Sequence, residues 1–327
     1  MNKQLFFVGF VVLVLIISSC KKTSTSTTNN SIGTNWVNYT TTKGLVNNSV
    51  NALAIDAKGN KWIGTESGIS KFNDTTWTNY NAANTNNGLA DDNVTAIAID
   101  GKGNKWFGGF LGVSKFDGTH WTTYLSITSV QAIAVDAQNN EWVGTQGNGV
   151  SKFDGTTWTN YTTTNGLLNN NVWTIAIDAQ GNKWFGTTGG VSKFDGTNWT
   201  SFTKTNGLVD STVLRIVIDS QGNKWFGTDF GVTKFDGTNW TTYTTTNTNH
   251  GLNGNSITSL AADTQDKWFG TWQGGVSKFD GTTWTNYIPV NAFNGTASVP
   301  VYAIAIDAKG NIWFGLAQGG GVSELKK

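Results

Sequence analysis

One unit of about 42 residues recurs seven times along the chain, and this repetition constrains the fold more than any other feature. Each copy carries a Trp in a run resembling G-N-K-W-F-G-T, and successive copies of this Trp lie 36 to 45 residues apart. These seven are Trp62, Trp106, Trp142, Trp184, Trp225, Trp268 and Trp313. A second Trp recurs in a W-T-x-Y-like run, at Trp36, Trp77, Trp121, Trp158, Trp199, Trp240 and Trp284. A repeat of this length is typical of the blades of a β-propeller.

Each unit contains four short runs of strand-forming residues separated by turn residues. In the fourth unit the predicted strands are 172–177, 183–187, 191–194 and 199–202. Gly181 and Gly196 stand in the turns between them, where a positive φ is needed. The density of Gly, Thr, Val and aromatic residues disfavours helices. We therefore predict an all-β chain that folds as a seven-bladed β-propeller of four-stranded blades.

The order of the runs at the two ends predicts how the ring closes. The first run, 36–39, is of the fourth type in the unit, and no earlier runs precede it to complete a blade. The last unit, 301–325, has the first three types and lacks the fourth. Pairing the leading run with the trailing three closes the ring and removes two open sheet edges. Residues 35–327 are therefore predicted to form one domain.

The repeating Trp residues predict the core of this domain. Each indole buries roughly 150–250 Å² when it packs, and a single blade cannot cover both of its own faces. We interpret all fourteen repeating Trp as core between blades. The alternative is a ring of platforms on which sugars stack.

The first residues have the character of a targeting signal. Lys3 precedes the apolar run 5–17, which is too short to span a membrane as a helix. The sequence Ile17-Ser18-Ser19-Cys20 follows and resembles the bacterial lipobox, in which the Cys is lipidated. We expect residues 1–19 to be a lipoprotein signal peptide and 20–34 a lipidated, flexible tether. The alternative is an ordinary signal peptide with a chance Cys.

The composition of the chain limits the classes of binding partner and of catalytic or metal site that it can have. The chain has 22 Lys and Arg against 21 Asp and Glu, so no net field attracts nucleic acid. One Cys and two His make a disulfide scaffold, a His-based metal site or a Ser-His triad a poor fit. The repeated Asp-x-x-Gly-Asn turns offer one carboxylate each, well short of a calcium site. We expect a monomer without metal or cofactor.

The run 178–194, DAQGNKWFGTTGGVSKF, resembles the two-component regulator propeller repeat, roughly D-x-x-G-N-x-W-x-G-T-x-x-G-G-x-x-x-F. The resemblance extends over nearly all of residues 35–327, although the sixth copy has a turn one residue shorter, at 263–266. It implies a propeller of the kind found in periplasmic sensors of hybrid histidine kinases that detect glycans. Those receptors continue into a further β-domain, a transmembrane helix and a kinase. No such segments follow up to Lys327, so we do not expect the signalling role here.

Positions that break the repeat are the candidate binding residues, because residues common to every blade are explained by folding. The second position of the first strand in each unit lies near the channel mouth and varies most. It includes Asn51, Gln131, Trp173 and Tyr302. Aromatic rings there can stack on a ligand, and the amides can hydrogen-bond it. The alternative is that these side chains only plug the channel.

The sole Arg of the chain, Arg215, occupies a position where four other blades have Ala. We weigh two roles for Arg215. It could form an internal ion pair with Asp229, or its guanidinium could bind a carboxylate or a sugar through two parallel N–H groups. Glu66 and Trp272 are further candidates in the turns on the same face, and the alternative for Trp272 is packing on a neighbouring blade.

The function predicted from these features is a non-enzymatic bacterial envelope lipoprotein, anchored through the lipid on Cys20 and expected in the outer membrane. One propeller face would bind a glycan-like ligand or an envelope protein. One alternative is a lyase, because virginiamycin B lyase resembles this chain in having seven blades with D-G-x-x-W-F-like repeats. The other alternative is a purely structural interaction scaffold.

Overall fold

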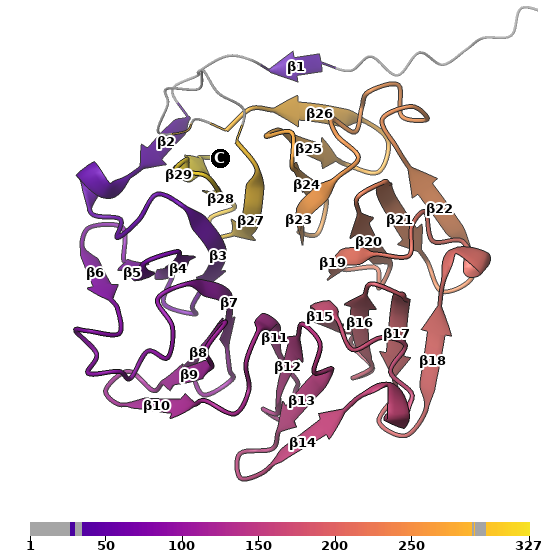
Figure 1. Cartoon of the computed structure of the whole chain (residues 1–327). Coiled ribbons are helices and arrows are strands. Elements are labelled where there is room, and N and C mark those ends of the chain that lie inside the picture. Colours follow the sequence, from indigo (N-terminus) through magenta and orange to yellow (C-terminus); the bar gives the residue numbers. More distant parts are fainter. Residues whose placement is uncertain (1–26, 30–34, 290, 292–298) are drawn as a thin grey trace, which may run out of the picture.

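The repeats form seven four-stranded antiparallel sheets arranged radially around a central channel (Figure 1). The computed structural model describes residues 27–29, 35–289, 291 and 299–327. This architecture confirms the predicted seven-bladed propeller. The predicted signal peptide, 1–19, and Cys20 lie outside the described residues. Within the predicted tether, 20–34, the structure describes only strand β1 (Thr27–Asn29), which pairs in parallel with β26 at the outer edge of a blade.

The blades are numbered 1 to 7 in chain order, and the strands of each blade are called a to d from the channel outward. The a strands are β3 (Val50–Ile55), β7 (Val94–Ile99), β11 (Val130–Val135), β15 (Val172–Ile177), β19 (Val213–Ile218), β23 (Ile257–Ala262) and β27 (Val301–Ile306). The b strands are β4 (Lys61–Thr65), β8 (Lys105–Gly109), β12 (Glu141–Thr145), β16 (Lys183–Thr187), β20 (Lys224–Thr228), β24 (Lys267–Thr271) and β28 (Ile312–Leu316).

The c strands are β5 (Gly68–Phe72), β9 (Val113–Phe116), β13 (Val150–Phe153), β17 (Gly190–Phe194), β21 (Gly231–Phe235), β25 (Val276–Phe279) and β29 (Gly321–Leu325). The d strands are β6 (Trp77–Tyr80), β10 (Trp121–Tyr124), β14 (Trp158–Tyr161), β18 (Trp199–Phe202), β22 (Trp240–Tyr243), β26 (Trp284–Tyr287) and, for blade 7, β2 (Trp36–Tyr39). Three short 3-10 turns, η1 (Thr41–Lys43), η2 (Thr163–Asn165) and η3 (Lys204–Asn206), lie in links between blades.

The N-terminal strand closes the ring as predicted. β2 pairs antiparallel with β29, with Trp36 opposite Leu325 and Tyr39 opposite Val322. The Tyr39 ring stacks on Trp313 of the same blade at 5.5 Å between centroids, and its hydroxyl donates to Glu324 Oε2 at 3.0 Å. Closure therefore depends on main-chain pairing together with one aromatic stack and one buried hydrogen bond.

The core consists of seven apolar clusters, one at each seam between neighbouring blades. The b-strand Trp of each blade is at most 4% exposed, which fits the predicted core. The d-strand Trp are less buried: Trp284 is 7% exposed, and the other six are half-buried at the outer edge of the seams. The prediction that all fourteen belong to the core is therefore too broad, because the outermost strand has solvent beside it.

A hydrogen bond from the indole to the turn before it fixes the b-strand Trp in six blades. In blade 4, Trp184 Nε1 donates to Asp178 Oδ2 at 2.9 Å, and Asp178 Oδ1 also accepts from the backbone N–H of Asn182. Five other blades repeat this bond at 2.8–3.2 Å. One carboxylate thus satisfies both the tight turn and a buried indole N–H, which would otherwise be costly.

At one seam the first residue of strand b is acidic, whereas at most of the other seams this residue is a Lys. At several seams the first residue of strand b is a Lys whose ammonium lies over the Trp of the preceding blade, as Lys183 does over Trp142 at 5.0 Å. Blade 3 has Glu141 there instead, 3% exposed and close to Asp100 of blade 2. Burial, together with the charge of Asp100, raises the pKa of Glu141 to about 7.

We expect Tyr39→Ala to lower the free energy of unfolding by about 3–5 kcal/mol, because it removes a packed ring at the closure of the propeller. Tyr39→Phe should cost only about 1 kcal/mol, since the ring remains and one hydrogen bond is lost. Urea denaturation of both variants measures the two contributions. An unchanged midpoint for Tyr39→Ala would contradict the role of β2 in closing the ring.

The raised pKa of Glu141 predicts a pH dependence of stability. Between its ordinary pKa of 4.5 and about 7, the folded chain holds more protons at Glu141 than the unfolded chain does. Stability therefore falls as pH rises through this window, by up to about 3 kcal/mol from this group. Urea denaturation at pH 4.5 and pH 7.5 should show this fall in the wild type and a smaller one in Glu141→Gln. Equal falls in both proteins would contradict the assignment.

Candidate functional site

The a strands carry a β-bulge near the channel mouth in every blade. The pairing register between strands a and b shifts after the first residue pair in all seven blades. Val50 faces Thr65 while Ala52 faces Gly64, so Asn51 is an extra residue in the ladder. A bulge bends the strand and re-aims the side chain of the extra residue. The bulged residue in each blade is the variable second position.

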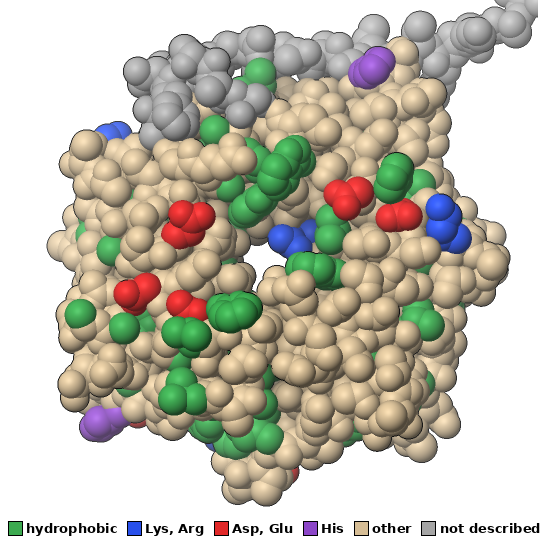
Figure 2. All heavy atoms as spheres, viewed as in Figure 1, with side chains coloured by type: hydrophobic (Ala, Val, Ile, Leu, Met, Phe, Trp, Pro, Cys, Tyr) green, Lys and Arg blue, Asp and Glu red, His purple; other side chains and the backbone are tan. Residues whose placement is uncertain are grey.

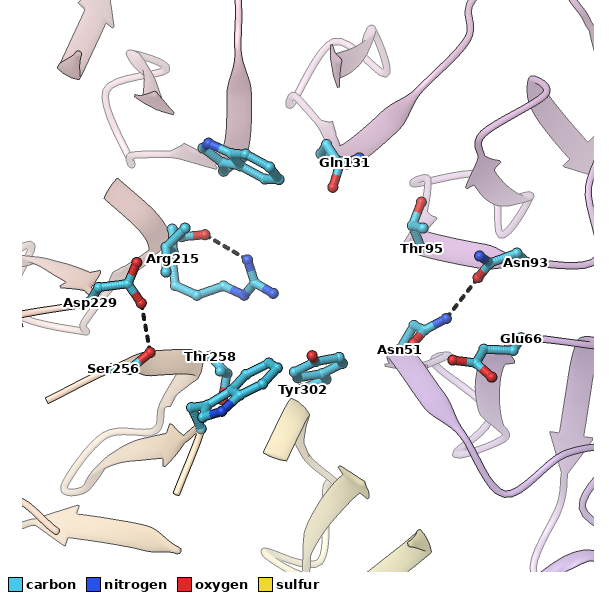
Figure 3. Close-up of a pocket in the computed structure, with 13 residues that line it drawn as sticks. Asn51, Glu66, Asn93, Thr95, Gln131, Arg215, Asp229, Ser256, Thr258 and Tyr302 are labelled. Atoms are coloured by element: carbon cyan, nitrogen blue, oxygen red, sulfur yellow. Dashed lines mark hydrogen bonds between the residues drawn. The ribbon is translucent and has the colours of Figure 1, made fainter. Parts of the chain in front are cut away.

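These seven bulged residues converge on one cavity of about 440 Å³ at the channel mouth (Figure 3). They are Asn51, Thr95, Gln131, Trp173, Leu214, Thr258 and Tyr302. Arg215 from the third position of β19 joins them, as do Glu66, Asp229 and Trp272 from the turns between strands b and c. All eight residues singled out as ligand-binding candidates thus line the same cavity. Their role in binding remains a prediction.

Asn93 and Ser256 also line the cavity, and the sequence analysis missed them. Each directly precedes an a strand. Asn93 accepts a bond from the Asn51 amide at 2.9 Å, and Ser256 donates to Asp229 at 2.6 Å. The signal that could have found them is the polar residue that stands before strand a in most blades.

The guanidinium of Arg215 extends from β19 into the cavity (Figure 3). Its one hydrogen bond to the described residues runs from Nη1 to the carbonyl of the adjacent Leu214, at 2.7 Å. No carboxylate of the described residues lies within 4 Å of it, and Asp229 is bonded to Ser256 instead. The expected internal ion pair between Arg215 and Asp229 is therefore wrong.

The surroundings of Arg215 make its unpaired charge costly. Burial lowers the pKa of the Arg215 guanidinium, and the hydroxyl of Tyr302 is the nearest group that opposes this effect. Burial also raises the pKa of Tyr302, which Arg215 lowers and Glu66 raises. Arg215 keeps part of its surface exposed at the channel mouth and its guanidinium stays ionised, so an anion placed beside it would recover part of the solvation lost on burial.

Aromatic rings form the apolar part of the cavity. The Trp272 ring lies 6.0 Å from the ring of Tyr302, which belongs to the next blade, and it remains 50% exposed. Trp272 therefore packs on a neighbouring blade and still presents an exposed face, and its role in ligand binding remains a prediction. Trp173 lines the cavity from blade 4, and its Nε1 has no partner among the described residues.

Two cavity hydroxyls are already engaged in the fold. Thr95 Oγ1 donates to the carbonyl of Val130 at 2.6 Å, and Thr258 Oγ1 donates to that of Val301 at 2.6 Å. Each bond ties an a strand to the next blade. Gln131, by contrast, makes no side-chain hydrogen bond with any other residue that the structure describes, which leaves its amide available to a ligand.

The face that carries this cavity also presents the exposed large apolar side chains of the described residues. They are Phe110, Leu111, Leu125, Phe230, Trp272 and Ile288, each 42–64% exposed. All six lie either in turns between strands b and c or in links between blades. Figure 2 shows this face with the hole at its centre, apolar and basic side chains at the edge of the hole, and acidic ones farther out.

The two histidines lie away from this cavity. His120 is in the turn between β9 and β10, close to Asp117, and His250 is in a link between blades. Across the described residues, no group of three His, Cys, Asp or Glu is placed to hold a metal ion. Among the helices in the described part of the chain, none has the length and apolar character needed to cross a membrane.

The comparisons with known proteins agree with the fold. The family described as Two component regulator propeller matches residues 166–189, so the chain contains this repeat, as its sequence resemblance predicted. No curated protein matches the chain.

Three of the many similar solved structures show the range of the likeness. The extracellular domain of a protein described as a hybrid two component system from B. thetaiotaomicron has a TM-score of 0.75 at 24% identity, covering 89% of this chain and 41% of that one. An inactive virginiamycin B lyase from Staphylococcus aureus with quinupristin scores 0.71 at 16%, covering 89% and 99%. YCF48 bound to D1 peptide scores 0.65 at 12%, covering 90% and 97%. These likenesses establish the fold, and this chain spans about two fifths of the length of the first.

Removing the unpaired charge should stabilise the protein. We expect Arg215→Met to raise the free energy of unfolding by about 1 kcal/mol, because the apolar stem is kept and the enclosed charge is lost. Arg215→Lys keeps the charge and serves as the control, with no rise expected. Urea denaturation of the three proteins makes the comparison. A loss of stability in Arg215→Met would indicate a structural role for the guanidinium.

Proposed function

We propose that this protein is a non-enzymatic lipoprotein of the bacterial envelope that binds an acidic glycan at the mouth of its propeller channel. The observation that carries the proposal is the guanidinium of Arg215, which reaches into an aromatic-lined cavity and has no carboxylate partner among the described residues. A planar guanidinium pairs well with the carboxylate of a sugar acid. The rings of Trp272, Tyr302 and Trp173 offer the apolar faces on which a sugar ring stacks.

The envelope location rests on the sequence 1–20. The apolar run and the lipobox-like segment ending at Cys20 support lipidation, which anchors a protein stably when two or more acyl chains are attached. The similar extracellular sensor domain from B. thetaiotaomicron is consistent with this location. We propose the outer membrane as the site of the anchor.

A protein partner is the second candidate. The six exposed apolar side chains on the cavity face support it, because exposed apolar surface is suited to contact with other proteins. The similarity to a propeller bound to a peptide adds to this reading. The hypothesis that the protein is a lyase has less support. Such a reaction needs a general base, and neither His of the chain lines the cavity.

Calorimetric titration with a trimer of galacturonic acid tests the proposal, and its carboxyl-reduced counterpart is the neutral control. We expect the acidic trimer alone to bind, and Arg215→Met to weaken it at least tenfold, the size of effect typical of a lost charged hydrogen bond. Thr200→Ala, on the outer strand β18, should bind like the wild type.

Two results would contradict the proposal. Equal binding of the neutral trimer, or unchanged binding by Arg215→Met, would show that Arg215 does not select an acid. If neither sugar binds while an envelope protein is retained by the wild type, the protein-partner reading replaces the glycan reading.

A further inference from the structure

In six of the seven seams between blades, an Asp and a Phe surround the b-strand Trp, and in four of these six a Lys of the next blade is a third neighbour. The b-strand Trp of one blade donates its N–H to an Asp of the preceding turn. A Phe from strand c of the next blade packs beside this indole, with centroids 5.9–6.4 Å apart. In four of these seams the next blade also places a Lys ammonium over the indole.

The seam between blades 6 and 7 lacks all three groups. Its turn, 263–266, is one residue short, and the carboxylate of Asp263 bonds only the backbone N–H groups of Gln265 and Asp266. Blade 7 supplies Ile312 where other blades have Lys or Glu, and Leu325 where they have Phe. Leu325 is smaller than Phe, and Ile312 is shorter than Lys or Glu and carries no charge.

The consequence is a buried donor without an acceptor. Trp268 is 4% exposed, and its Nε1 has no hydrogen-bond partner in the described part of the chain. Of the seven b-strand Trp, this is the one whose indole is left so. An unpaired buried N–H costs about 1–3 kcal/mol, so an acceptor that reached it would bind favourably.

A cavity of about 300 Å³ lies at this seam. Its apolar walls come from Trp268, Tyr287, Ile312 and Leu325, and Lys326 and Lys327 also line it. Lys278 lies there too, paired with Asp266 at 3.2 Å. The volume is at the lower end of those that hold small organic ligands. None of the residues that line this cavity lines the channel cavity, and the site does not depend on the function proposed for the channel.

We propose that the seam between blades 6 and 7 is a second binding site, which takes a small monocarboxylate with a flat apolar body. The carboxylate stands where the turn Asp stands in the other seams and accepts the N–H of Trp268. The body fills the space that Phe and Lys fill elsewhere. The apolar Ile312 in place of Lys favours an uncharged body. Lys326 and Lys327, which form no ion pair with the described residues, favour the anion, while the carboxylate of Asp263 at the same cavity opposes it.

Titration of the full chain with sodium benzoate tests this site, with benzamide as the neutral probe of the same shape. Indole N–H resonances in two-dimensional NMR spectra give the readout, and the Trp268 resonance is assigned as the one missing in Trp268→Phe. We expect benzoate to shift this resonance and benzamide to bind at least tenfold more weakly. Failure of benzoate to shift it, or equal binding of the two probes, would overturn the proposal.

Two variants introduce residues that other seams have. Leu325→Phe should fold with an unchanged or higher Tm and weaken benzoate binding at least tenfold, because the ring occupies the space of the ligand. Ile312→Glu, which introduces the carboxylate that blade 3 has in Glu141, should weaken benzoate at least tenfold by repulsion. Two variants are used because either one alone could fail to fold. Binding retained by a folded variant of this pair would overturn the proposal.

The matched control opens a similar space at a seam whose indole is already satisfied. Lys224→Ile combined with Phe235→Leu makes the seam between blades 4 and 5 resemble the seam between blades 6 and 7, while Asp178 still accepts from Trp184 at 2.9 Å. We expect no benzoate-induced shift of the Trp184 indole resonance. If this seam gains binding equal to that of the wild-type site, the unpaired N–H is not what selects the ligand, and the proposal fails.

Discussion

The ring depends on the contact that the indole of each b-strand Trp makes between two blades. In six of the seven blades the turn of the same blade accepts the N–H of this indole. Packing alone would leave a polar N–H in an apolar seam, and the turn alone would leave a buried carboxylate. When the indole N–H donates to the carboxylate, both groups have a hydrogen-bond partner, as Trp184 and Asp178 have in blade 4. This coupling explains why the Asp and the Trp recur six residues apart in six of the seven blades.

Much of this architecture is readable from the sequence because the determinants are local and repeated. The period gives the number of blades, and the alternation of apolar residues with turn residues gives strands that match the structure closely. In blade 4 the one difference is that β17 begins at Gly190 rather than at residue 191. The closing pair of β2 and β29 follows from which runs are missing at the two ends. The convergence of the eight candidate residues follows from the direction in which strand a enters the channel.

Other features depend on geometry that one sequence does not encode. Arg215 and Asp229 are near each other in the chain, yet the Ser256 hydroxyl captures the carboxylate and the guanidinium turns to the carbonyl of Leu214. The half-burial of the outer Trp reflects how much of strand d faces solvent, which a repeat pattern does not report. Two blades depart from the pattern, with Glu141 at one seam and Ile312 at another. The effect of each departure is recognised only when its seam is compared with the seams that follow the pattern.

The bulge at the second residue of each inner strand has a consequence for how such a protein can change over generations. That residue stands outside the main-chain ladder, so its replacement leaves the pairing of Val50 with Thr65, and of its counterparts, untouched. Each blade thus has one position whose side chain can change without altering the pairing of strands a and b, and only at Thr95 and Thr258 would the change also remove a described hydroxyl bond to the next blade. Because seven such positions surround one opening, substitutions can change the chemistry of the opening while selection retains the propeller fold.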